Sequence, residues 1–331
     1  MKDPLGTIRD GVSALSGRRP SETNGHLPPD GGVILDTAAL TATRVSAWAA
    51  VMIAREPKRP HALDVIERVF SRFQELHGDR SFRDDPAIVG GIAELDGTPV
   101  VVVGQQKGSS TEENIERNFG MPHPEGYRKA IRLYRLAEKF HLPLVTLIDT
   151  PGAYPGPEAE ERGQAEAIAR SIETMSRLRT PIVAIVLGEG GSGGALALGV
   201  GDVVLAMQNA IYSVISPEGC AAILWRSATE AERAATSLRL AAPDLLELGI
   251  VDGLLPEPPG GAHVDHDRTA GPVKAALVAQ LERLERVPIA DLLAARYERF
   301  RAMGVYEEPT LPAAPPKRPW WQRLVQGLPG A

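Results

Sequence analysis

Three apolar runs, each opened by a proline, constrain the fold of this chain more than any other feature of its sequence. They are PVVVVG at 99–104, PLVTLID at 143–149 and PIVAIVLG at 181–188. Apolar residues fill these runs nearly throughout, whereas a strand with one solvent-exposed face alternates apolar and polar residues. A glycine-rich break and then a helical stretch follow the apolar runs. The pattern predicts an α/β fold whose strands are covered on both faces.

Further strands extend this prediction. GDVVLAM at 201–207 and AIYSVI at 210–215 each combine β-branched and other apolar residues, as strands do. AIVGGIAELDGTPVVVV at 87–103 predicts a hairpin that turns at Asp96-Gly97, because Asp-Gly between two apolar runs is a strong two-residue turn signal.

Two helices are predicted after the glycine-rich breaks. Apolar side chains recur at helical spacing in residues 160–179, which is typical of an amphipathic helix packed on a sheet. We expect its core face to consist of Ala165, Ile168, Ile172, Met175 and Leu178. GGALALGVGD at 193–202 contains mainly small apolar residues, and we expect a helix there that is buried on nearly every side.

The two ends of the chain differ from its middle. Residues 1–36 hold Gly, Pro and polar residues without a period, so we expect a disordered N-terminal extension. A single domain is predicted for 37–304, beginning with a helix over Thr37–Arg55. We expect residues 305–331 to be a flexible Pro-rich C-terminal tail with a Trp-containing segment, which either docks or is a solvated extension.

Composition excludes several classes of function. The chain of 331 residues has a net charge of -6, which gives no reason to expect nucleic-acid binding. Its single cysteine, Cys220, allows neither an internal disulfide nor a multi-cysteine zinc site, and we expect a small buried residue there. There is no apolar run of about 20 residues and no signal-peptide pattern, so we expect a cytoplasmic protein without a membrane contact.

Two glycine-rich loops carry the predicted chemistry. DTPGAYPG spans 149–156 and GEGGSGG spans 188–194, each directly after an apolar run. A helix start offers unpaired backbone N–H groups, and glycine lets another molecule approach them closely. If the loops converge, one N–H from each would hold a developing enolate or urea anion. The alternative is a glycine-rich helix start that serves packing alone.

Ser192 provides another interpretation, because GGSGG fits the Gly-x-Ser-x-Gly pattern of a serine hydrolase. That chemistry needs a histidine base and a carboxylate. The chain has seven histidines, and none can be assigned to this role by spacing. The match to the hydrolase pattern is also weak evidence, because glycine fills every position of 188–194 except Glu189 and Ser192.

Several segments together carry a specific resemblance to a known family. Residues 43–300 resemble the alpha-subunit family of bacterial acetyl-coenzyme A carboxylase carboxyltransferases, in the crotonase-like superfamily. The segments are KRPHALDVI, AIVGGIAELDG, NFGMPHPEGYRKA, IDTPGAYPG, AEERGQAEAIAR, GEGGSGGALALGVGD and YSVISPEGCAAILW. The resemblance implies a crotonase-like (ClpP/crotonase) spiral of strand-loop-helix units for the carboxyltransferase domain 37–304, with an N-terminal helix.

The resemblance also implies a reaction and partners. Carboxybiotin on a carrier protein would give its carboxyl group to acetyl-CoA, yielding malonyl-CoA for fatty acid biosynthesis. A carboxyltransferase beta subunit would share the site in an α2β2 complex and would hold the zinc, so that this chain binds no metal. Biotin carboxyl carrier protein and biotin carboxylase would be the other partners. No tightly bound cofactor is expected in this chain.

Site residues follow from the matching motifs. Those implied as catalytic, through backbone N–H groups, are Gly193, Gly194, Gly156 and Tyr154. Those implied as substrate-binding are Gly152, Ala153, Pro155, Gly191, Ser192 and Lys107. Lys107 and the cluster Arg128, Lys129 and Arg132 could attract phosphates or acidic partners, but nearby glutamates favour a solvated face for that cluster.

A crotonase-like hydratase or isomerase is the nearest rival. Such hydratases use two glutamates, and Glu218 in SPEG matches the second position while the first falls on Leu196. One carboxylate cannot carry out both proton transfers. A serine peptidase using Ser192 and a noncatalytic scaffold are the remaining alternatives.

Overall fold

The computed structural model describes residues 44–304, and a mixed sheet of eight strands lies at their centre. Its strand order is β1-β2-β3-β4-β5-β6-β8, with β7 paired to β5 outside this path. The strands are β1 Ser71–Glu75, β2 Ile88–Leu95, β3 Thr98–Gln105, β4 Leu144–Thr150, β5 Ile182–Gly191, β6 Val203–Met207, β7 Ile211–Ser213 and β8 Gly253–Leu255. The predicted α/β class is therefore confirmed.

Each of the three apolar runs forms a strand, as predicted. β3, β4 and β5 are neighbours and run parallel, and every residue of β4 is buried. A strand covered on both faces has no solvent-facing position, which explains why these runs do not alternate. The hairpin is also confirmed, because β2 and β3 pair antiparallel around Asp96 and Gly97 with φ values of 47° and 85°.

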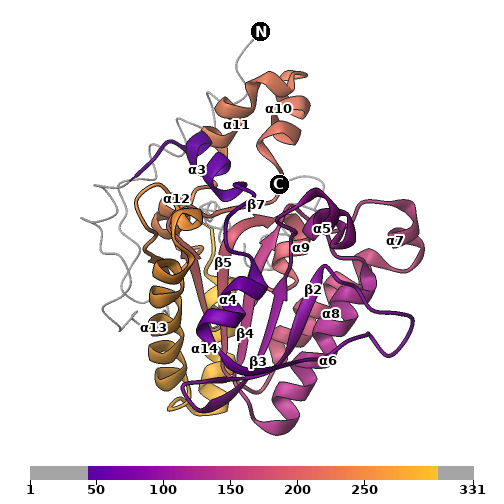
Figure 1. Ribbon diagram of the computed structural model, residues 1–331, viewed down its shortest axis with the longest axis vertical. Helices are drawn as coiled ribbons and strands as arrows, with labels where there is room; N and C mark the ends of the chain where they lie inside the picture. The colour runs from indigo at the N-terminus through magenta and orange to yellow at the C-terminus, as the bar shows by residue number, and fades with distance from the viewer. Residues whose placement is uncertain (1–43, 305–331) are drawn as a thin grey trace, which may run out of the picture.

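Helices cover the sheet on both sides and at one end (Figure 1). In this view α6 and α8 lie to the right of the sheet, and α13 and α14 lie to the left. The α-helices are α3 Ala47–Ala54, α4 Ala62–Val69, α5 Thr111–Glu116, α6 Pro124–Phe140, α7 Pro157–Glu161, α8 Gln164–Arg177, α9 Ser192–Leu196, α10 Pro217–Trp225, α11 Ala231–Leu238, α12 Ala242–Glu247, α13 His266–Leu284 and α14 Ile289–Arg301. Short 3-10 helices are η1 Asn118–Gly120, η2 Ala228–Glu230 and η3 Ala262–Val264.

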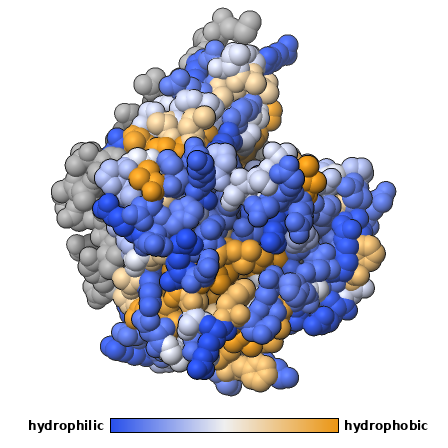
Figure 2. All heavy atoms as spheres, in the orientation of Figure 1, coloured by the Kyte–Doolittle hydropathy of each residue, from blue (hydrophilic) through white to orange (hydrophobic). Residues whose placement is uncertain are grey.

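The two halves of strand β5 pair with different strands, and this pairing decides where its glycine-rich end lies. Residues 183–186 pair with β6, whereas residues 189–191 pair with β7. The second half therefore leaves the neighbourhood of β6 and reaches the end of the sheet where α3, α10 and α11 gather in Figure 1. Figure 2 shows hydrophobic surface on this projecting α10–α11 region, where Ile223 is 72% exposed.

Two helix predictions require correction. In α8 the buried residues are Gln164, Ala167, Ser171 and Met175, whereas Ala165 is exposed. Of the predicted core face, Met175 and Leu178 are buried and Ile168 and Ile172 pack against the core, so that only Ala165 was wrongly predicted.

The helix predicted over 193–202 ends at Leu196, and Leu196 is 39% exposed. The carbonyl of Ala197 accepts from Ser171 and that of Leu198 accepts from Thr146, so side chains satisfy groups that a longer helix would use. Of the helix predicted for Thr37–Arg55, the described part forms α3, and residues 37–43 lie outside the described residues.

The basic cluster on α6 is structural, and its prediction as a solvated face is wrong. Lys129 is fully buried, and its ammonium contacts the carboxylate of Asp84 at 2.5 Å and the carbonyl of Asp85 at 2.8 Å. Arg128 pairs with Asp79. Arg132 donates to the carbonyls of residues 77 and 78. The cluster therefore holds segment 77–85 against α6.

The remaining predictions concern the ends, membranes and Cys220. The 1–36 extension and the 305–331 tail lie outside the described residues. No described helix combines the length and the apolar character that a membrane crossing requires. Cys220 is free and buried, as predicted.

We predict that the Lys129–Asp84 contact makes the fold acid-sensitive. Although burial raises the pKa of Asp84, the Lys129 ammonium and the N–H of Gly78 lower it from 3.8 to about 2. A carboxyl whose pKa is lower in the folded state stabilises the fold above its unfolded pKa, and this stabilisation is lost as the pH falls through the folded value. The free energy of unfolding in urea should therefore differ clearly between wild type and Lys129→Met at neutral pH, and this difference should shrink as the pH falls to about 2. An equal difference at all pH values would contradict this assignment.

Candidate functional site

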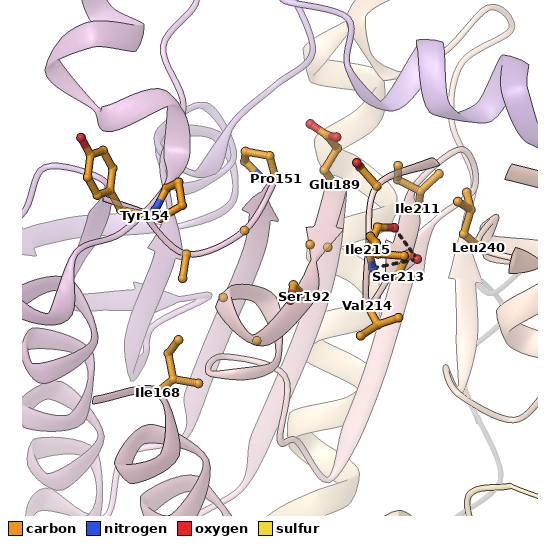
Figure 3. Close-up of a pocket in the computed structure, with 18 of the residues that line it drawn as sticks. Pro151, Tyr154, Ile168, Glu189, Ser192, Ile211, Ser213, Val214, Ile215 and Leu240 are labelled. Carbon is orange, nitrogen blue, oxygen red and sulfur yellow. Dashed lines mark hydrogen bonds between the residues drawn. The ribbon is translucent and has the colours of Figure 1, made fainter. Parts of the chain in front are cut away.

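A pocket of about 460 Å³ lies at the carboxyl ends of β4 and β5. Figure 3 shows Tyr154 and Ile168 on one side, Val214 and Leu240 on the other, and Ser192 between them. Eight of the ten residues predicted for the site line it: Gly152, Ala153, Tyr154, Pro155, Gly191, Ser192, Gly193 and Gly194. Gly156 and Lys107 are not part of the lining.

The two glycine-rich loops converge, as the sequence predicts, and glycine permits their contact. A methyl group on Gly194 would lie 2.5 Å from the backbone nitrogen of Ala153. One on Gly191 would overlap the carbonyl of Pro151. Distances this short are below any van der Waals contact, so the loops can meet only where these side chains are absent.

Gly193 differs from its neighbours. A methyl group there would meet only Ile168, at 3.6 Å, which is an ordinary contact with another pocket residue. Neither Gly193 nor Gly194 has a positive φ. A side chain at Gly193 would thus enter the pocket without disturbing the core.

The start of α9 faces this pocket without a side-chain cap. Gly191 is the N-cap residue, and no side chain accepts a hydrogen bond from the first turn. Ser192 is exposed and has a φ of 52°, a left-handed conformation that non-glycine residues rarely adopt. Among the described residues that line the pocket there is no histidine. The serine hydrolase interpretation therefore lacks its base.

The loop after β4 offers fewer free donors than the sequence implies. The N–H of Gly152 donates to the hydroxyl of Thr150, and that of Tyr154 donates to the carbonyl of Pro122. Within residues 44–304, the N–H groups of Ala153 and Gly156 donate to no protein acceptor. Ala153 also lines the pocket and touches Gly194, so its N–H is the donor best placed beside α9.

The ring of Tyr154 is held in place by its neighbours. It stacks on His123 with 4.1 Å between ring centroids, and a methyl group on Gly156 would overlap it. Burial and the charges of Arg83 and Arg162 lower the pKa of His123, which favours a neutral ring beside Tyr154. Gly156 thus admits the Tyr154 ring and starts α7 as its N-cap residue.

Ion pairs that the sequence did not reveal lie at the wall of the pocket. Arg55 donates to Glu189 at 2.7 Å and to Glu218 at 2.7 Å. Arg55 and Glu189 line the pocket. The two carboxylates are 134 and 163 residues from Arg55 in the chain, and no local pattern pairs residues at such separations. The one local signal was a lone glutamate, Glu189, within a run of glycines.

Glu218 is unsuited to the acid-base role that its position suggests. Burial raises the pKa of Glu218, but the hydrogen bonds from Arg55, its own backbone N–H and Ser216, together with the Arg55 charge, bring it below its ordinary value. The carboxyl group therefore stays ionised and paired. The position of the other hydratase glutamate is occupied by Leu196, so the two-glutamate scheme does not fit this pocket.

Lys107 is largely buried and contacts Glu189 in the wall of the pocket. Its ammonium lies 2.8 Å from carboxylate oxygens of both Asp149 and Glu189. Burial lowers the pKa of Lys107, but these two carboxylates raise it above its ordinary value. For Asp149 burial acts in the opposite direction and raises the pKa, but Lys107 and His61 hold it well below its ordinary value. No cluster of three or more His, Cys, Asp or Glu suited to a metal occurs among the described residues.

Comparison with known proteins identifies the relatives of this chain. The family described as Acetyl co-enzyme A carboxylase carboxyltransferase-like matches residues 36–304. The acetyl-coenzyme A carboxylase carboxyl transferase subunit alpha of Methylococcus capsulatus is 60% identical over 265 residues, which cover 80% of this chain and 83% of that protein. A protein of the same name from Thermus thermophilus is 59% identical over 269 residues, covering 81% of this chain and 86% of its own.

A solved structure shares the fold at lower identity. Transcarboxylase 12S, with methylmalonyl-coenzyme A and methylmalonic acid bound, has a TM-score of 0.57 and 20% sequence identity. The match covers 79% of this chain and 47% of the transcarboxylase chain. At this identity the likeness concerns the fold alone, and it supports the fold predicted for residues 37–304.

The two glycines of α9 should respond differently to alanine. Gly194→Ala should destabilise the fold by roughly 1 to 3 kcal/mol, because its methyl group would push Ala153 away. Gly193→Ala should change the free energy of unfolding by less than about 0.5 kcal/mol, since its methyl group meets only Ile168. Urea unfolding of both variants provides the measurement. Equal destabilisation by both would show that the loop contact is not as close as described.

Proposed function

We propose that this chain, which belongs to the acetyl co-enzyme A carboxylase carboxyltransferase-like family, holds carboxybiotin in the pocket between its two glycine-rich loops. Its activity is carboxyl transfer and its place is that of an alpha subunit, as in relatives about 60% identical along most of the chain. The observation that carries the proposal is the contact between the uncapped start of α9 and the loop at Ala153.

The proposed chemistry needs backbone donors and no side-chain nucleophile. The bond between the ureido nitrogen and the carboxyl carbon of carboxybiotin breaks, and the electron pair moves to the ureido group as carbon dioxide departs. N–H groups near Ala153 and Gly193 stabilise the resulting negative charge on the ureido oxygen. The biotin anion then takes a proton from the methyl group of acetyl-CoA. The acetyl-CoA carbanion attacks carbon dioxide, and malonyl-CoA forms.

A second chain completes the proposed site. An alpha subunit acts together with other subunits, and we propose a beta subunit that binds acetyl-CoA, carries zinc and joins this chain in an α2β2 complex. Val214 lines the pocket yet is 78% exposed, so the pocket is open on that side. Biotin carboxyl carrier protein would deliver the carboxybiotin that biotin carboxylase makes. Neither this chain nor its pocket would then need a bound cofactor of its own.

Activity should depend on the beta subunit. If this chain supplies only the carboxybiotin half of the site, the purified chain should show almost no consumption of malonyl-CoA with free biotin in the reverse reaction. Mixing with the beta subunit should restore it, and the beta subunit alone is the control. Full activity of the isolated chain would contradict a shared site.

Ser192→Ala should lower carboxyl transfer by less than about tenfold. Its neighbours contribute backbone N–H groups, and alanine keeps the backbone of α9. The measurement is kcat for malonyl-CoA consumption in the mixed complex, with the urea midpoint as a control for folding. A loss of several orders of magnitude in a folded variant would revive Ser192 as a nucleophile.

A further inference from the structure

Lys107 binds two carboxylates that lie at the starts of the two pocket loops. It lies just after β3, and its ammonium is 2.8 Å from Asp149 at the end of β4 and 2.8 Å from Glu189 near the end of β5. The side chains of Lys107, Asp149 and Glu189 are only 12%, 0% and 10% exposed. One buried cation therefore joins the carboxyl ends of three neighbouring strands.

The two carboxylates precede the residues that meet in the pocket. Asp149 is followed after one residue by the Pro151–Ala153 loop, and Glu189 is followed by Gly190 and Gly191. The carboxylate of Asp149 also accepts the backbone N–H of Glu189 at 3.0 Å. Lys107 thus acts on the backbone of both loops through groups within a few residues of their contact.

Neighbouring groups fix this arrangement from both ends. His61, at the start of α4, contacts the second oxygen of Asp149 at 2.8 Å. Arg55, at the end of α3, binds the second oxygen of Glu189. A methyl group on Gly120 would lie 2.5 Å from Cγ of Lys107, so the lysine stem is packed against backbone. The ammonium has little freedom to leave its two partners.

We propose that Lys107 is a positioning residue that sets the spacing between the two donor loops of the carboxyltransferase site. This inference rests on the proposed function, and it replaces the expected role of Lys107 in contacting substrate. The ammonium faces Asp149 and Glu189, and Lys107 is not among the residues that line the pocket. Misplacement of a catalytic group by about 1 Å can lower a rate by about 10²-fold, so a spacing device has a large effect on turnover.

The test compares Lys107→Met with Arg299→Met in the complex with the beta subunit. Arg299 is a matched control, because it is 4% exposed and pairs at 3.0 Å with Asp252, which accepts the N–H of Val204. That pair lies at the start of β6, whereas Lys107 lies at the carboxyl ends of the neighbouring strands. Both variants remove one buried cation that holds a strand end.

Two readouts separate positioning from other roles. Lys107→Met should lower kcat by about 10²-fold with KM for free biotin changed by less than about threefold. Amide hydrogen exchange at Glu189 and Tyr154 should become at least about tenfold faster, because the Glu189 N–H donates to Asp149 and the Tyr154 N–H holds its loop to the carbonyl of Pro122. Arg299→Met should change neither readout. A higher KM with kcat and loop exchange unchanged would instead show a substrate contact and overturn the proposal.

A second variant decides the matter if Lys107→Met does not fold. Lys107→Met/Asp149→Asn removes one positive and one negative charge, and Glu189 keeps Arg55 as a partner. It should fold, exchange faster in the loops and have a kcat below wild type. Wild-type exchange and kcat in this variant, or a failure to fold, would contradict the proposal. If the wild-type complex shows no carboxyl transfer, the proposed function fails, and the exchange readout still tests whether Lys107 positions the loops.

Discussion

The site depends on one close approach between two backbones. Gly191 and Gly194 lie against the loop Pro151–Ala153 so closely that a methyl group on either would collide with it. Parallel pairing of β4 with β5 brings the two loops to the same end of the sheet. Because glycine has no side chain, the two loop backbones can then come into direct contact. Because the proposed donors are backbone N–H groups, chemistry here depends on chain geometry more than on any single side chain.

Buried ion pairs keep that geometry fixed. A buried charge is tolerated only when it is paired, and removal of one partner leaves the other uncompensated. The fold uses such pairs at both ends of its strands, with Lys107 bridging Asp149 and Glu189 at one end and Arg296 binding Asp202 near the other. Each pair joins segments distant in sequence, so the strand ends cannot move independently.

Local patterns predicted the strands, and long-range partners explain the errors. The hairpin at Asp96-Gly97 and the two glycine-rich loops are encoded within a few adjacent residues, so the sequence alone placed them. The sequence pattern favours a solvated Lys129, because its partner Asp84 is 45 residues away and no local signal pairs the two. The same reason hides the two partners of Lys107, Asp149 and Glu189, of which Glu189 is 82 residues away. Helical spacing also places Ala165 on the core face of α8, but this residue is exposed and lines the pocket.

The side chains around the pocket decide which chemistry this fold carries out. Ser192 has the strained, exposed geometry of a nucleophile, but no histidine lines the described pocket. Glu218 is bound by Arg55, and Leu196 stands where a second glutamate would be needed. The described lining holds no histidine, and its carboxylates are Glu189, which Arg55 binds, and the exposed Glu160. Under the proposed function, the base that takes the methyl proton comes from the substrate. A ureido anion formed by loss of carbon dioxide is such a base, which is why a pocket built from backbone donors suits carboxyl transfer better than hydration or hydrolysis.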